Sequence, residues 1–372
     1  MTTLDRYVLR GMLAPLGASA LLVAELLVAA QLLQLGDVVF GSGVRLADVL
    51  RLGLLLSPHF AVMAIPLAFL LAVMLGLGRL SQDGELAALA SAGLSPWRLY
   101  RVPVAAALAL GAVTAALSLW AEPLGMRAIR RELNAIIERN VTSGLVPGVF
   151  SEDLPGFTLY ARAGGNGRYQ GVLVDDEREG APVLALARAG AIEAGGDDER
   201  VSVELTEGEL HAVEASPDGK GAYTVARFPS GTLEIGVKDR LWSKNRFYDS
   251  LAARTLLELR AMARHARERG DDEAWARLST AADGRLAVGF TCLAFALVGV
   301  PLAAGGRRGG RARAYLATLG LVVAYYLLAR AGDALAESRH VPPAVAAWLP
   351  LALLAALGTG LAASRWRRGA WL

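Results

Sequence analysis

Four ionisable side chains interrupt otherwise apolar stretches, and they are the first candidates for chemistry: Glu25, His59, Arg330 and Asp333. A carboxylate or an imidazole can act as a general acid or base, and charged residues at membrane depth are often functional. Arg330 and Asp333 are three residues apart, a helical spacing at which their charges can pair. The other candidates fall in different apolar stretches, so no nucleophile stands beside a base. A membrane-embedded lipid-modifying enzyme that uses Glu25, His59 or Asp333 is therefore an alternative, not the main interpretation.

Residue counts and motifs exclude several other kinds of site. One cysteine, Cys292, and four scattered histidines leave no Cys-based zinc or iron–sulfur site and no internal disulfide. The sequence lacks the G-x-x-x-x-G-K-[ST] motif that binds ATP phosphates. The arginines form short clusters between apolar runs, a pattern not typical of nucleic-acid binding. We expect a chain without catalytic residues, metal, cofactor or nucleic-acid partner.

The composition is that of a membrane protein. Hydrophobic residues make up 54% of the 372 residues, charged residues 20%, and the mean hydropathy is +0.40. A hydrocarbon core about 30 Å thick needs roughly 20 apolar helical residues. Six stretches approach or exceed that length: 11–35, 49–78, 102–121, 286–304, 314–332 and 343–363. We predict a polytopic α-helical protein with three helices in residues 1–122, three in 286–372, and a large domain, 123–285, between them.

Arginine distribution predicts the orientation. The side that would hold both termini carries twelve arginines: Arg6, Arg10, Arg79, Arg98, Arg101, Arg307, Arg308, Arg311, Arg313, Arg365, Arg367 and Arg368. The two short loops on the opposite side contain only Arg45 and Arg339. The positive-inside rule therefore places the termini in the cytoplasm and the central domain outside it.

Arginines also cluster near the predicted outer membrane surface. They are Arg45, Arg51, Arg127, Arg130 and Arg131. Guanidinium groups bind phosphate in a bidentate manner, so this belt suits a phosphorylated lipid substrate. Ordinary anionic lipids would suit it equally, and the sequence leaves both interpretations open.

Within the central domain, residues 148–238 change to a two-residue hydrophobic period. Five strands are predicted: 157–162, 168–174, 183–192, 201–210 and 223–237. Glycine-, asparagine- and aspartate-rich clusters separate them, so we expect an antiparallel sandwich or jelly-roll-like sheet. Residues 124–140 are expected to continue the third membrane helix, and 251–282 to form a charged helical return to the fourth.

The loop between the second and third membrane helices, residues 79–98, predicts a short amphipathic helix at about 81–93. Ser81 or Asp83 would cap it, Glu85 would complement the helix dipole, and Gly93 would end it in the left-handed conformation. Ser95 and Pro96 would then begin the third membrane helix. Such a helix on the cytoplasmic side can transmit force from a soluble motor, or can simply lie at the membrane interface. In the first case Leu86 and Leu89 would enter a groove of the partner and Glu85 would pair with a basic residue.

Several segments carry a resemblance to a known family. Residues 80–101 resemble the cytoplasmic coupling segment of the LptF/LptG permeases, the membrane subunits of the bacterial lipopolysaccharide exporter, and residues 4–10 (LDRYVLR) resemble their N-terminal entry. Residues 298–302 (VGVPL), followed by the basic stretch 305–311 (GGRRGGR), resemble the end of the fourth helix and the loop after it. The order of three helices, periplasmic β jelly-roll and three helices also matches, and the basic loop is nearer the LptF branch.

The resemblance implies a non-enzymatic permease of the inner membrane that exports lipopolysaccharide. Its expected partners are a dimer of an LptB-like ABC ATPase, a second LptF/LptG-type permease and an LptC/LptA-like jelly-roll bridge protein. ATPase contacts are expected at Ser81, Asp83, Glu85, Leu86, Leu89 and Arg98. Lipid or cavity contacts are expected at Glu25, Arg45, Arg51 and Arg330. A periplasmic assembly factor or sensor is the remaining alternative, and it would not need a coupling helix.

Overall fold

The computed structural model describes residues 3–34, 46–142, 147–154, 157–165, 167–176, 183–194, 200–214, 222–236, 251–304, 310–338 and 340–367. The chain divides into two compact units. One comprises Met1–Ala30, Leu56–Met126 and Leu251–Leu372, and the other comprises Gln31–Leu55 and Arg127–Ser250.

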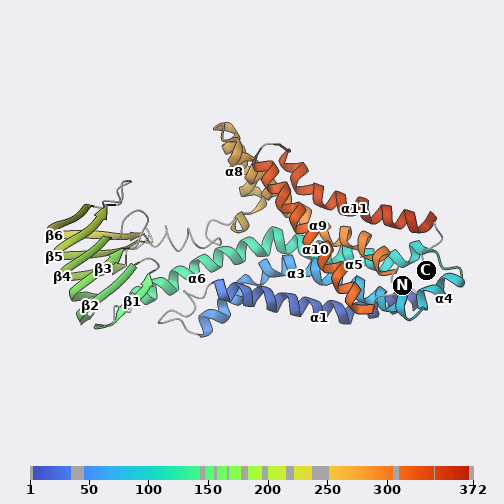
Figure 1. Ribbon diagram of the computed structural model, residues 1–372, viewed down its shortest axis with the longest axis horizontal. Helices are drawn as coiled ribbons and strands as arrows, with labels where there is room; N and C mark the ends of the chain where they lie inside the picture. Colours follow the sequence, from blue (N-terminus) through green and yellow to red (C-terminus); the bar gives the residue numbers. More distant parts are fainter. Residues whose placement is uncertain are drawn as a thin grey trace. The chain divides into compact units, whose positions relative to one another are not determined.

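Six helices in the described residues are long and apolar enough to cross a membrane, as predicted. They belong to α1 (Thr3–Gln34), α3 (Leu46–Gln82), α5 (Pro96–Ala116) with its continuation, α9 (Asp272–Ala304), α10 (Gly310–Glu337) and α11 (Pro343–Arg367) (Figure 1). The continuation of α5 is also confirmed: a π-helical turn, η1 (Leu117–Ala121), leads directly into α6 (Glu122–Thr142). Each helix extends beyond its apolar stretch, because polar residues at the ends add turns that need no hydrocarbon.

The core of the helical unit lies where α3, α5 and α9 meet. Phe69 and Phe295 are fully buried there. A Cβ added at Gly111 of α5 would lie 2.3 Å from the carbonyl oxygen of Gly289 on α9. Two glycines therefore allow the backbones of α5 and α9 to cross in contact, the close packing that small residues give to membrane helices.

Helices α1 and α10 are much less covered. The side chains of Leu21, Leu22 and Leu26 on α1 and of Leu319 and Leu327 on α10 are each about 60% exposed or more. Apolar surface of this kind suits lipid or another protein.

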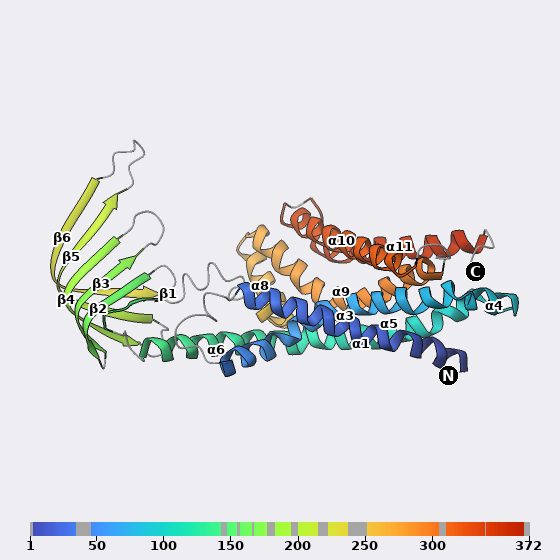
Figure 2. The same cartoon turned by 60° about the horizontal axis from the view of Figure 1, so that its bottom comes forward.

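The inserted antiparallel sheet, expected between the third and fourth membrane helices, is confirmed. It consists of β1 (Phe150–Leu154), β2 (Phe157–Gly165), β3 (Arg168–Asp176), β4 (Val183–Ala194), β5 (Arg200–Glu214) and β6 (Ala222–Gly236). Each strand pairs with its neighbours in the sequence, in the order β1 to β6 (Figure 2). The sequence did not predict β1 or this strand order. Ala161, Val174 and Val203 form the buried centre of one face.

The return from the sheet is helical, as predicted for 251–282, but it is broken twice. A short turn, η2 (Leu251–Ala253), precedes α8 (Leu256–Glu268), whose start is closed by a capping box between Thr255 and Glu258. Gly270, with φ +73°, then reverses the chain into α9. Leu259 and Leu278 bury a small core between α8 and α9.

Candidate functional site

The predicted short helix after the second membrane helix is present as α4 (Glu85–Ser91). Glycines close both ends: Gly84 has φ +74° and Gly93 has φ +81°, the left-handed conformation expected for Gly93. The predicted caps are wrong, because Gly84 occupies the N-cap without a side-chain hydrogen bond. Ser81 is buried and donates instead to the carbonyl of Ala304, 2.9 Å away, while Asp83 pairs with Arg79 at 3.5 Å.

The two leucines of α4 do not project as expected. Leu86 is 3% exposed and packs into the core of this chain, and Leu89 is partly buried against the same core. The expectation that the Leu86 side chain enters a partner's groove is therefore corrected. Burial of these apolar side chains holds the seven-residue helix against the helical unit. The exposed residues of α4 and of the turn before it are small or polar, among them Asp83, Ala88 and Ser91.

Glu85 is held by a residue far away in the sequence. The hydroxyl of Tyr7, near the start of α1, donates a hydrogen bond to Oε1 of Glu85 over 2.9 Å. Both residues were in segments singled out by the sequence, but their contact was not predicted. It joins α4 to the poorly covered helix α1, so the predicted motor contact is linked to α1 by a hydrogen bond.

The third membrane helix begins at Pro96, with Ser95 at its N-cap, as predicted, although the Ser95 side chain makes no capping hydrogen bond. Beside it, Trp97 is 57% exposed, and its ring lies 5.9 Å from that of Tyr100. Arg98 is also exposed. Trp97 was missed by sequence reasoning, although an aromatic residue at a helix end near the membrane interface is a usable signal.

A second polar group lies within the helical unit and was recognised only in part. Nδ1 of His59 is 2.7 Å from Oε1 of Glu122, and the Arg285 guanidinium is 3.4 Å from Oε2 of the same carboxylate. Glu122 and Arg285 are buried, and His59 is partly buried. Arg285 also donates to the carbonyls of Leu251 and Ala252 in η2, at 3.1 and 2.7 Å. His59 thus belongs to a polar network with Glu122 and Arg285, built from side chains and carbonyls of this one chain.

Three of the four lipid or cavity candidates lie within the described residues. Glu25 is exposed on α1. Arg45 lies outside the described residues. Arg51 pairs with Glu132 at 3.1 Å, and its side chain is 66% exposed. Arg330 lies on α10, so the three described candidates belong to three different helices.

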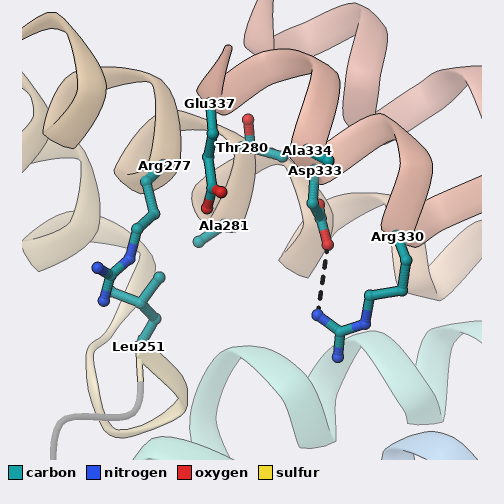
Figure 3. A pocket seen from close by; sticks show the side chains of 8 residues that line it. All are labelled: Leu251, Arg277, Thr280, Ala281, Arg330, Asp333, Ala334 and Glu337. Atoms are coloured by element: carbon teal, nitrogen blue, oxygen red, sulfur yellow. Dashed lines mark ion pairs between the residues drawn. The ribbon is translucent and has the colours of Figure 1, made fainter.

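Arg330 does pair with Asp333, as the spacing predicted, at 3.5 Å. The pair lines a cavity of about 420 Å³ formed by η2, α9 and α10. Its other polar lining residues are Arg277, Thr280 and Glu337 (Figure 3). Sequence reasoning did not find Arg277 or Glu337, because both lie at polar helix ends where charges are common.

Within the residues that the structure describes, no group of three or more His, Cys, Asp or Glu side chains could hold a metal ion. The long apolar helices, the inserted sheet and the anchored helix α4 define a multi-pass membrane protein with a polar surface segment between its second and third spans.

The chain belongs to the family of the lipopolysaccharide export system permease LptF/LptG, whose family model matches residues 6–364. It is accordingly a permease of lipopolysaccharide export, a transporter subunit and not an enzyme. Comparison with curated proteins gives no match. The lipid-modifying enzyme considered above is thereby set aside.

Proposed function

We propose that this permease takes lipopolysaccharide from the outer leaflet of the inner membrane and passes it to a periplasmic bridge. A dimeric, LptB-like ABC ATPase would supply the energy, and a second LptF/LptG-type permease would complete the transport cavity. Both termini and α4 would then be cytoplasmic, and residues 123–285 would form the periplasmic domain, with its sheet at about 148–238.

The observation that carries the proposal is the anchoring of α4. Leu86 is buried beneath the helix, Ser81 ties the preceding turn to Ala304, and Tyr7 holds Glu85. These three attachments hold α4 rigidly against the helical unit. A force applied to its outward surface would therefore be transmitted to α1 and α9. Asp83, Glu85, Leu89 and Arg98 are the residues proposed to contact the ATPase at or beside this surface, supported by the exposed ring of Trp97.

The exposed apolar surfaces of α1 and α10 support the proposal of a second permease. Helices α1 and α10 carry exposed leucines over most of their length, and Glu25 lies among those of α1. A carboxylate on a lipid-exposed surface is costly, about 2.5–3.5 kcal/mol at a helix centre on translocon scales, so it is expected to face a polar cavity or a partner. Glu25 and Arg330 are therefore proposed to line the transport cavity, with Arg45 and Arg51 nearer its outer rim.

The terminal strands of the sheet support the proposal that a bridge protein binds this chain. Strands β1 and β6 each pair with a single described strand, so each has one edge available for backbone pairing. Addition of a strand to such an edge is a common way of joining sheets. The basic sequence of residues 305–311 supports the proposal that the chain belongs to the LptF branch, with an LptG-like permease as the proposed partner.

Affinity purification of the chain from its own membranes tests the proposal. The native chain is expected to bring down an ABC ATPase and a second permease. Glu85→Lys is expected to remove the ATPase and leave the permease, because the reversed charge would face a basic residue of the motor. Glu273→Lys, a charge reversal at the exposed start of α9, is the matched control and should retain both partners. Retention of the ATPase by Glu85→Lys would contradict the assigned docking site.

A further inference from the structure

The cavity between η2, α9 and α10 is lined by both signs of charge (Figure 3). Two carboxylates, Asp333 and Glu337, lie four residues apart on α10 and therefore on one face of that helix. Arg277 enters from α9 on one side, and Arg330 lies on the other. The lining thus combines arginines with carboxylates, whereas a purely anionic ligand would be suited by arginines alone.

Part of this lining is without a partner. Within the described part of the chain, Arg277 and Glu337 line the same cavity but form no ion pair with each other or with another residue. Thr280 also belongs to the lining, is only 7% exposed, and its buried Oγ1 has no hydrogen-bond partner among the described residues. A buried hydroxyl without a partner destabilises the structure, and a bound polar group would remove that cost.

Apolar surface leads away from the cavity along α10. Residues 323, 327, 330, 334 and 337 follow one helical face, with steps of three and four residues. Val323 is 48% exposed and Leu327 is 65% exposed, so this face changes from charged to apolar toward the middle of the helix. A ligand with a polar head and acyl chains matches that change, whereas a soluble ion would use only the charged end.

We infer that this cavity binds the headgroup of a zwitterionic phospholipid of the phosphoethanolamine class. The ammonium group lies between the carboxylates of Asp333 and Glu337, and the phosphate pairs with Arg277 and accepts a hydrogen bond from Thr280. One acyl chain runs along Val323 and Leu327. Because the site uses charges of both signs, it holds a resident membrane lipid and discriminates against anionic phospholipids. This assignment goes beyond export of lipopolysaccharide and does not depend on where the ATPase binds.

Native mass spectrometry of the full chain, purified with its copurifying partners, tests this inference. The sample is exchanged into equimolar phosphatidylethanolamine and phosphatidylglycerol with matched acyl chains. Phosphatidylethanolamine is expected to be retained in clear excess. The double variant Arg277→Gln/Glu337→Gln should lose most of that excess, while Arg264→Gln/Glu273→Gln, a pair of exposed residues outside the cavity lining, should keep it.

Two further arms identify the source of the ligand. Phosphoethanolamine without acyl chains should not be retained, and added lipopolysaccharide should not displace the phospholipid. Equal retention of both phospholipids, an unchanged excess in the Arg277→Gln/Glu337→Gln variant, retention of free phosphoethanolamine, or displacement by lipopolysaccharide would each overturn the inference. The comparison of the two phospholipids needs only the protein without substitutions. The inference can therefore be overturned even if the double variant does not fold.

Discussion

Arg285 donates a hydrogen bond to the backbone carbonyl of Ser118, a group that the helix around it leaves unpaired. In the π-helical turn, the N–H of Glu122 bonds to the carbonyl of Leu117 and not to that of Ser118. The next residue, Pro123, has no N–H to offer. The Arg285 guanidinium, which comes from α9, supplies the missing donor. The same side chain also binds the Glu122 carboxylate and two backbone carbonyls of η2.

Arg285→Gln should therefore destabilise the helical unit by about 3–5 kcal/mol, the usual effect of removing one partner from a buried charge pair. Glu122 would be left buried beside an unpaired carbonyl. Arg51→Gln is the comparison, because the exposed Arg51–Glu132 pair should contribute less than about 1 kcal/mol. Equilibrium denaturation in detergent micelles measures both, and equal losses for the two variants would contradict the role given to Arg285.

Leu86→Ala should lower stability by about 2–5 kcal/mol, because it removes a buried leucine from beneath α4. The loss of ATPase binding that follows would be indirect. The control is Ala88→Gly, at an exposed position of the same helix. It removes no buried contact and should lower stability by only about 1 kcal/mol, through the lower helix propensity of glycine. Thermal unfolding of the purified permease separates the two. A stable Leu86→Ala protein that no longer binds the ATPase would indicate direct contact instead.

Tyr7→Phe should uncouple the motor from the permease without releasing it. The substitution removes only the hydroxyl that donates to Glu85, so α4 keeps its buried anchor and its outward surface. Copurification of the ATPase should be unchanged, while ATP-dependent release of lipopolysaccharide from proteoliposomes falls several-fold. Tyr315→Phe, at an exposed tyrosine near the start of α10, is the matched control. Normal export by Tyr7→Phe would remove the contact from the coupling route.

Gly111→Ala should be poorly tolerated despite adding one methyl group. The new Cβ would lie 2.3 Å from the Gly289 carbonyl oxygen, so α5 and α9 would have to separate. Overpacking of this kind costs about 1–3 kcal/mol. Gly320→Ala, where a Cβ would have no neighbour within 4 Å, should be neutral or stabilising. The unfolding midpoints of the two variants in one detergent give the comparison, and similar midpoints would show that the helices can part without cost.

The sequence was informative about the membrane helices because hydrocarbon imposes a length and a composition on them. Backbone constraints located α4: Gly93 can adopt the left-handed conformation that ends a helix, and Pro96 has a fixed φ that suits the start of the next one. It misassigned Ser81, whose hydroxyl can serve a local cap or a distant carbonyl equally well. Only the fold decides between the two, by placing Ala304 within 2.9 Å.

The contacts that the sequence could not predict are those between segments far apart in the chain. Tyr7 and Glu85 are 78 residues apart, and Glu122 and Arg285 are 163 apart. Each of these residues reads alone as an ordinary helix-end charge or interfacial aromatic residue. Likewise, a hydrophobic period indicates which strands have a buried face, but it does not order them within a sheet.

The consecutive strand order has a consequence for how the molecule is made. Every described strand of the sheet pairs with the one just before it, so pairing needs only short loops to close, and contacts of low sequence separation form fast. A chain synthesised from its N-terminus can therefore add strands one at a time, as they are made. Among the described strands none follows β6, so this sheet can be completed before α9 is synthesised.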